Sequence, residues 1–272
     1  MRSIAIMNQK GGVGKTTTAV NVSAALAAAG QRTLLIDLDP QAHASLHFGL
    51  APHELGASVY DVLTGEASLA EARVRVSDNL ELVSSHIDLA AAEVELAGVV
   101  GRELILRDKV AEDSAEFDYL LIDCPPSLGI LTINALATVE EVLLPLQPHF
   151  LALHGLSKLL ETISLVARRL NDRLRLSGVV FCMYESGTRL AGEVSGDVEA
   201  FFEQARHEAG PWSTAHTFQT RIRRNIRLAE APSFGQSIFD YAPSCNGAED
   251  YRLLAAELLE LPKPTQLVAA HH

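Results

Sequence analysis

The chain is 272 residues long, 48% of its residues are hydrophobic, and its formal net charge is −12. The acidic charge excludes a protein that coats nucleic acid with its whole surface, and no apolar run approaches the ~18 residues of a membrane span. The three cysteines, Cys124, Cys182 and Cys245, are far apart, which excludes a disulfide framework and a zinc site. We therefore expect a cytoplasmic protein with one domain at residues 1–261 and a short flexible tail at 262–272.

The first predicted strand, residues 4–7, leads through a glycine-rich loop into an alanine-rich helix pattern at 16–29. Three glycines in four residues allow the backbone N–H groups of the loop to face a polyphosphate at the start of the helix. Lys15 is placed to reach the β- and γ-phosphates, and the Thr16 hydroxyl to coordinate Mg²⁺. The alternative is a glycine-rich turn that binds nothing. The strand before the loop and the helix after it favour a phosphate-binding loop (P-loop).

The second predicted strand, residues 33–36, is followed by Asp37 and Asp39. In parallel sheets, ligands bind outside the carboxyl ends of the strands, so these two carboxylates are candidate site residues. The alternative for Asp37 is a turn or cap acid after the strand. The chain then continues through a loop-rich excursion at 43–75 with a helical piece at 59–63, a strand at 80–83 and helical spacing over 87–111.

A third apolar strand, residues 119–122, ends in Asp123, and the following Cys124-Pro125-Pro126-Ser127 cannot continue a strand because proline lacks a donor. A buried strand that places one carboxylate beside a P-loop has the Walker B form. Such a carboxylate holds the Mg²⁺ shell through Thr16 or water. A hydrophobic strand ending in Asp is common by itself, and the P-loop upstream is what favours this interpretation.

Further strands are predicted at 142–146 and 178–183, and helices at 151–174, 191–207 and 249–260. The alternation of helices with buried strands predicts the α/β class: a mostly parallel twisted sheet with helices on both faces, typical of a P-loop NTPase.

Residues 218–228 hold four arginines with no acid between them: Arg221, Arg223, Arg224 and Arg227. Most charge runs form a solvated face. In an otherwise acidic protein, however, this cluster is also a candidate surface for the phosphates of DNA.

The loop Lys10-Gly11-Gly12-Val13-Gly14-Lys15-Thr16-Thr17 resembles the deviant Walker A motif of the ParA/MinD ATPases, with Gln9 where the general P-loop pattern has glycine. Three further stretches are similar to the chromosomal ParA (Soj) branch of that family. They are Asp37-Leu38-Asp39-Pro40-Gln41, Asp123-Cys124-Pro125-Pro126-Ser127-Leu128-Gly129, and Asn225-Ile226-Arg227-Leu228-Ala229-Glu230-Ala231-Pro232-Ser233-Phe234-Gly235.

The resemblance implies a Mg²⁺-dependent DNA-partitioning ATPase. ATP drives formation of a sandwich homodimer that binds non-specific DNA on the nucleoid, and hydrolysis, stimulated by a ParB-like centromere-binding protein with a positively charged N-terminal peptide, resets it. The implied catalytic residues are Lys10, which reaches the partner's nucleotide, Lys15, and Asp39, which positions the attacking water. The implied nucleotide-binding residues are Lys10, Gly11, Gly12, Val13, Gly14, Lys15, Thr16, Thr17, Met183 and Asn225. The implied metal-site residues are Thr16, Asp37 and Asp123, and the implied DNA-binding residues are Arg221, Arg223, Arg224 and Arg227.

Two departures leave the adenine contacts open. Arg223 stands where the family usually has proline, and residues 205–217 do not match the family's pattern.

The sequence bears on three other functions. A MinD-type membrane ATPase needs a basic amphipathic C-terminal helix, and the tail carries two prolines and one lysine. An iron–sulfur reductase needs cluster cysteines facing the dimer axis. A ParA-like ATPase that positions protein cargo stays an open alternative.

Overall fold

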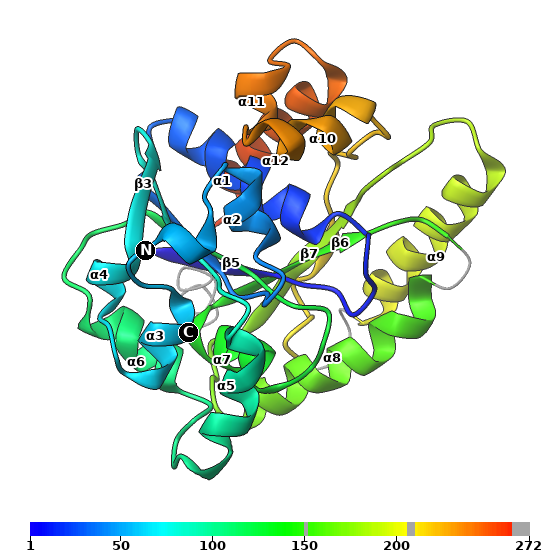
Figure 1. The fold of residues 1–272 in the computed structure, drawn as a ribbon. Helices are drawn as coiled ribbons and strands as arrows, with labels where there is room; N and C mark the ends of the chain where they lie inside the picture. The colour runs from blue at the N-terminus through cyan, green and yellow to red at the C-terminus, as the bar shows by residue number, and fades with distance from the viewer. Residues whose placement is uncertain (150–151, 206–209, 263–272) are drawn as a thin grey trace.

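The computed structural model describes residues 1–149, 152–205 and 210–262 (Figure 1). The strands of this part are β1 (Arg2–Ile6), β2 (Thr33–Asp37), β3 (Arg73–Ser77), β4 (Leu80–Val83), β5 (Tyr119–Asp123), β6 (Glu141–Leu146), β7 (Arg175–Phe181) and β8 (His216–Thr217). They form one sheet in the order β3-β4-β2-β5-β1-β6-β7-β8. Only the β3–β4 pair is antiparallel in the described sheet, so the predicted α/β class with a mostly parallel sheet is confirmed.

Helices cover both faces of the sheet. They are α1 (Lys15–Ala28), α2 (His43–His47), α3 (Val59–Thr64), α4 (Leu69–Ala72), α5 (Leu89–Glu95), α6 (Ile105–Glu112), α7 (Ile130–Thr138), α8 (Ala152–Arg169), α9 (Arg189–Ala205), α10 (Ile226–Glu230), α11 (Ile238–Tyr241) and α12 (Asn246–Glu260). Short 3₁₀ helices are η1 (Pro52–Glu54), η2 (Leu96–Gly98) and η3 (Ala231–Phe234).

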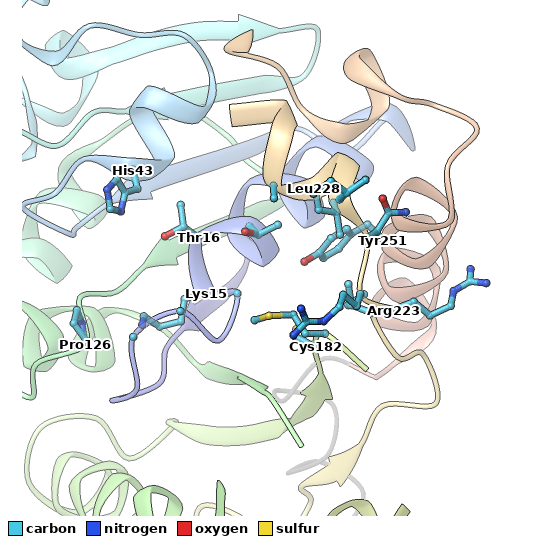
Figure 2. Close-up of a pocket in the computed structure, with 18 of the residues that line it drawn as sticks. Lys15, Thr16, His43, Pro126, Cys182, Arg223, Leu228 and Tyr251 are labelled. Atoms are coloured by element: carbon cyan, nitrogen blue, oxygen red, sulfur yellow. The ribbon is translucent and has the colours of Figure 1, made fainter. Parts of the chain in front are cut away.

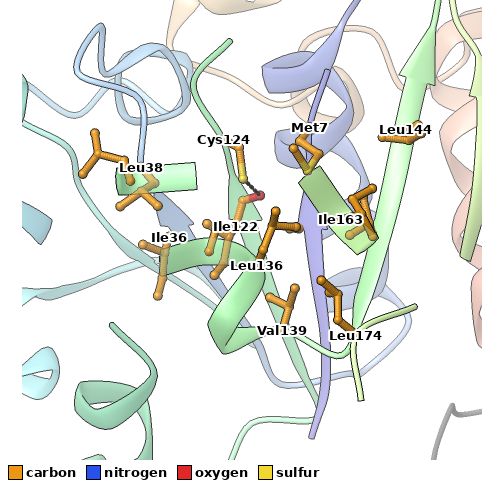
Figure 3. Packing of buried hydrophobic residues seen from close by; sticks show 14 of the residues in the cluster. Met7, Ile36, Leu38, Ile122, Cys124, Leu136, Val139, Leu144, Ile163 and Leu174 are labelled. Carbon is orange, nitrogen blue, oxygen red and sulfur yellow. Dashed lines mark hydrogen bonds between the residues drawn. The ribbon is translucent and has the colours of Figure 1, made fainter. Parts of the chain in front are cut away.

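The hydrophobic core is divided by the sheet into two clusters because successive side chains of a strand point to opposite faces. Ile36 and Ile122 belong to the cluster that packs against α7 and α8, which Figure 3 shows together with Leu136 and Ile163. Leu35 and Leu121, their neighbours in the chain, belong to the other cluster, which packs against α1 and α12. Strands buried on both faces explain why their sequences are continuous apolar runs with no alternation.

One local prediction was wrong and a second was incomplete. The helical spacing over residues 87–111 gives two helices, α5 and α6, because the chain turns between them where Gly101 adopts a left-handed conformation (φ 76°). In the excursion at 43–75, the helical piece predicted at 59–63 is confirmed as α3, but α2, η1, α4 and the start of the edge strand β3, with its alternating Arg-Val-Arg-Val pattern, were not assigned. β3 lies antiparallel to β4 at the edge of the sheet and therefore needs no long crossover connection.

The tail predicted at 262–272 lies outside the described residues from 263 onward, and so does part of the unmatched segment 205–217. Within the described ranges, no helix is long and apolar enough to cross a membrane.

Candidate nucleotide site

The P-loop joins β1 to α1 at the carboxyl edge of the sheet. Gly12 (φ 71°) and Gly14 (φ 94°) are in the left-handed region that L side chains rarely adopt, so the turn requires glycine at both positions. Gly14 is the N-cap of α1, and no side chain in the described part of the chain caps this helix. The first N–H groups of α1 and the positive end of its dipole therefore face the loop, as an anion-binding site requires.

The two lysines of the loop have different surroundings. Lys15 is buried, and its Nζ donates a hydrogen bond to the carbonyl oxygen of Lys10 (3.1 Å). Burial lowers the pKa of Lys15, and the nearby carboxylates of Asp123 and Asp39 act in the opposite direction. Lys10 is exposed, and its Nζ contacts Nε2 of His149. Lys15 is thus buried within the loop, whereas the Lys10 side chain lies at the surface.

Asp37 and Asp123 lie side by side because they are register partners on β2 and β5. Both are buried, and burial raises the pKa of each, that of Asp37 to about 6. Asp37 accepts hydrogen bonds from the backbone N–H (2.8 Å) and the hydroxyl (2.7 Å) of Ser45 and from the backbone N–H of Asp39 (3.3 Å). Its carboxylate is therefore occupied in holding the segment that carries Asp39.

Asp123 differs, because among the described residues no hydrogen bond of regular geometry reaches either of its carboxylate oxygens, and the Thr16 hydroxyl is the polar group beside them. The nearby charge of Asp37 further raises the pKa of Asp123, whereas the Thr16 hydroxyl beside it lowers that pKa. A buried carboxylate with unused oxygens next to a hydroxyl is a set of hard oxygen donors of the kind that Mg²⁺ prefers. Thr16 and Asp123 therefore fit a Mg²⁺ site, with Asp37 as the support behind them.

A pocket of about 850 Å³ opens above these groups. Figure 2 shows Lys15 and Thr16 towards one side of it and Cys182, Leu228 and Tyr251 towards the other. Asp39 lines the pocket, and its Oδ1 accepts a hydrogen bond from the backbone N–H of Gln41 (3.0 Å). The volume and the division into a polar and an apolar part suit a nucleotide, with phosphates on the lysine side and a base on the other.

Most of the predicted nucleotide-binding residues lie together in this pocket. Those in its lining are Gly11, Gly12, Gly14, Lys15, Thr16, Thr17, Met183 and Asn225. Val13 is buried beneath the loop, and Lys10 lies outside the lining. Met183 has a left-handed backbone (φ 50°), which is unusual for a non-glycine residue and typical of a functional position.

Sequence reasoning missed several lining residues. Cys182 lies at the end of a strand and Tyr251 within a helix, so local patterns gave no signal for them. The Tyr251 hydroxyl is hydrogen-bonded to that of Thr18 (3.1 Å), which ties α12 to α1 under the apolar part of the pocket. Burial raises the pKa of the Cys182 thiol to about 12.

The four predicted DNA-binding arginines are each paired with an acid. Arg221 pairs with Glu199 (3.6 Å), Arg224 with Glu185 (2.7 Å) and Arg227 with Glu230 (2.8 Å). Arg223 and Arg224 both line the nucleotide pocket, and the guanidinium of Arg223 binds Asp250 (2.6 Å) and Glu249 (2.7 Å).

The Arg223 backbone N–H also donates to Asp250 (2.8 Å), a bond that a proline at this position could not make. Arg223 therefore anchors the wall of the pocket to the first turns of α12.

The chain is similar to a known family model and to several proteins of known name. The family model described as "AAA domain" matches residues 1–176. The chain is 44% identical to the chromosome-partitioning ATPase Soj of Treponema pallidum, over 95% of this chain and 97% of that protein. It is 41% identical to the chromosome partitioning protein ParA of Caulobacter vibrioides, over 99% and 98% of the two chains.

A solved structure from Mycobacterium smegmatis, described as cobyrinic acid a,c-diamide synthase with a bound ATP analogue and magnesium, is also similar. It has 37% identity and a TM-score of 0.79 over 95% of this chain and 94% of that one.

Proposed function

The chain belongs to the ParA (Soj) family of P-loop ATPases, and from this premise we propose that it is a DNA-partitioning ATPase whose ATP-bound form is a homodimer. The observation that carries the proposal is the different placement of its two loop lysines. Lys15 is buried against the Lys10 carbonyl, and the Lys10 side chain is exposed at the surface. One lysine serves the phosphates of its own subunit, and the other, exposed beside His149, serves those of a neighbour.

In this proposal the triphosphate lies on the N–H groups at the start of α1, with Lys15 against its β- and γ-phosphates. Thr16 and Asp123 hold Mg²⁺, which neutralises charge on the phosphates. Asp37 keeps the Asp39 segment in position through its bonds to Ser45 and to the Asp39 N–H. The apolar side of the pocket, with Met183 and Asn225 in its wall, takes the base.

Asp39 is the residue we assign to orienting the attacking water, because phosphoryl transfer depends on in-line positioning and charge stabilisation more than on covalent help. It lines the pocket on the phosphate side, and the Gln41 N–H fixes one of its oxygens. Lys10 of each subunit neutralises the triphosphate of the other, so ATP binding favours the dimer and hydrolysis releases it.

Non-specific DNA is proposed to contact Arg221, Arg224 and Arg227 on the dimer. Arg224 and Arg227 and their partners Glu185 and Glu230 each have at least one-third of the side chain exposed to solvent. Exposed pairs of this kind stabilise a protein by about 0–1 kcal/mol, so DNA phosphates can displace the acids. Arg223 suits this role less well, because its main partner, Asp250, is buried.

The experiment is ATP-dependent retention on non-specific duplex DNA. We expect wild-type protein to be retained with ATP and Mg²⁺ and released after hydrolysis, with a steep decrease as salt rises. The double variant Arg221→Glu/Arg227→Glu, whose two side chains lie outside the lining of the nucleotide pocket, should lose at least tenfold in retention while binding ATP normally, and Arg75→Glu, on the far edge strand β3, is the matched control.

Two results would count against the proposal. Retention that does not depend on ATP contradicts the partitioning cycle, and normal retention of the double variant removes this patch as the DNA surface. Purification with a protein assembly in place of DNA would favour the cargo-positioning alternative.

Amide synthesis of the kind named for the Mycobacterium smegmatis structure receives less support. Glutamine-dependent amide synthesis uses a thiolate nucleophile, which requires an accessible cysteine of lowered pKa. Here Cys124 and Cys182 are both buried, and burial raises the pKa of each thiol, whereas the partly exposed Cys245, at the N-cap of α12, is not in the lining of the nucleotide pocket.

A further inference from the structure

The segment from Ile87 to Gly101, which contains α5 and η2, forms an apolar and acidic surface that the nucleotide site does not use. Its exposed apolar side chains are Ile87 (60% exposed), Val94 (78%), Val99 (45%) and Val100 (100%). Branched apolar residues gathered in this way mark an interaction surface more often than singly scattered ones do. We call residues 87–101 the α5 surface.

The charge of the α5 surface is of one sign. Asp88, Glu93 and Glu95 are exposed, and the sequence has no lysine or arginine between residues 87 and 101. The next basic residue, Arg102, donates to the Glu103 carboxylate and to the carbonyl of Ala97, so its charge is largely offset. An apolar surface ringed by acids is complementary to a segment that carries both apolar and basic side chains.

The α5 surface is joined directly to the loop that follows the Walker B strand. The Glu93 carboxylate lies against Gly129, so closely that a Cβ atom added at Gly129 would overlap it. Gly129 is the N-cap of α7 and ends the loop that begins at Asp123 and includes Pro126, which lines the nucleotide pocket. Glu93 is therefore a direct contact between α5 and the loop that follows Asp123.

We propose that the α5 surface is where the hydrolysis-stimulating partner docks, through a cationic amphipathic segment, and that Glu93 against Gly129 couples this docking to the catalytic loop. The inference rests on the proposed function, because it locates the partner of that same ATPase cycle. The partner's apolar side chains pack on Val94 and its neighbours, and its basic side chains pair with Asp88 and Glu95.

The test uses a synthetic peptide of the basic N-terminal segment of the ParB-like protein from the same genome. Its binding to full-length protein with ATP is followed by fluorescence anisotropy, and its stimulation of ATP hydrolysis is measured in parallel. Val94→Lys removes apolar contact and adds a like charge, so we expect about tenfold weaker peptide binding with basal hydrolysis and the ATP-dependent dimer unchanged. Leu253→Lys is the control, because Leu253 is also exposed and lies on α12, at the other end of the molecule (Figure 1).

Gly129→Ala tests the coupling separately from docking. Its backbone (φ −76°) accepts alanine, but the added methyl displaces Glu93. We expect this variant to bind the peptide as wild type does and to lose most of the stimulation. Normal stimulation of Gly129→Ala would overturn the coupling through Glu93.

The remaining outcomes separate this inference from the function on which it rests. Wild-type binding and stimulation of Val94→Lys would overturn the docking site while the proposed function stands. Loss of the ATP-dependent dimer in Val94→Lys would also overturn it, and would assign the α5 surface to contact between two copies. A wild-type ATPase that the peptide does not stimulate would overturn the partner role and the docking site together.

Discussion

Replacing Asp39 with alanine is expected to reduce ATP hydrolysis by about 10²- to 10⁴-fold, the range typical of losing a group that positions or deprotonates a nucleophile. Nucleotide binding should persist, because the N–H groups of α1, Lys15 and the Thr16–Asp123 pair are untouched. In the proposed cycle the dimer dissociates after hydrolysis. With hydrolysis blocked, sedimentation with ATP should therefore show a stable dimer that remains bound to DNA.

The matched control for Asp39→Ala is Asp78→Ala, since the Asp78 side chain is 93% exposed on the far edge of the sheet. Hydrolysis at the wild-type rate in Asp39→Ala would remove Asp39 from the catalytic step. A variant that stays monomeric and unbound in every condition would contradict the cycle itself.

The second large effect is expected from Lys10→Ala. Removing one member of a close charge pair at an interface costs about 2–5 kcal/mol, and a sandwich dimer holds two symmetric copies of this contact. Lys10→Ala should therefore bind ATP within each subunit but remain monomeric in sedimentation velocity at concentrations where the wild type dimerises. It should also fail to be retained on DNA.

Lys15→Ala provides the contrast that separates the two lysines. Lys15 is buried beside the carboxylates of the site, and its ammonium is proposed to contact the β- and γ-phosphates. Loss of that contact should abolish nucleotide binding by the single subunit. Lys109→Ala, on the outer helix α6, controls for loss of a lysine at a distance. If Lys10→Ala and Lys15→Ala both lose nucleotide binding and are otherwise indistinguishable, the division of labour between them is wrong.

Local sequence predicts well the parts of this molecule whose structure depends on neighbouring residues, namely the buried strands and the turn of the P-loop. The strands ending in Asp37 and Asp123 were placed within a residue or two, because buried parallel strands are continuous apolar runs that end abruptly. The turn of the P-loop follows from Gly12 and Gly14, because glycine adopts a positive φ without the steric cost of a Cβ atom.

The parts that were missed depend on contacts between distant segments. Cys182 and Tyr251 meet in the pocket because β7 and α12 pack beside α1, and no local pattern reports that. The predicted metal-site residue Asp37 accepts two hydrogen bonds from Ser45, eight residues further on, and no local pattern in the sequence indicates that contact. The arginine run reads as a bare positive patch, yet acids from other elements pair with its members: Glu185, Glu199, Glu249 and Asp250.

The most direct measurement is a crystal structure of the protein with a non-hydrolysable ATP analogue and Mg²⁺. We expect a symmetric dimer in which the Lys10 ammonium has left His149 and lies within hydrogen-bond distance of the analogue's phosphates in the opposite subunit, while Lys15 stays with its own. A single subunit that encloses the nucleotide alone, with Lys10 directed into solvent, would contradict the account.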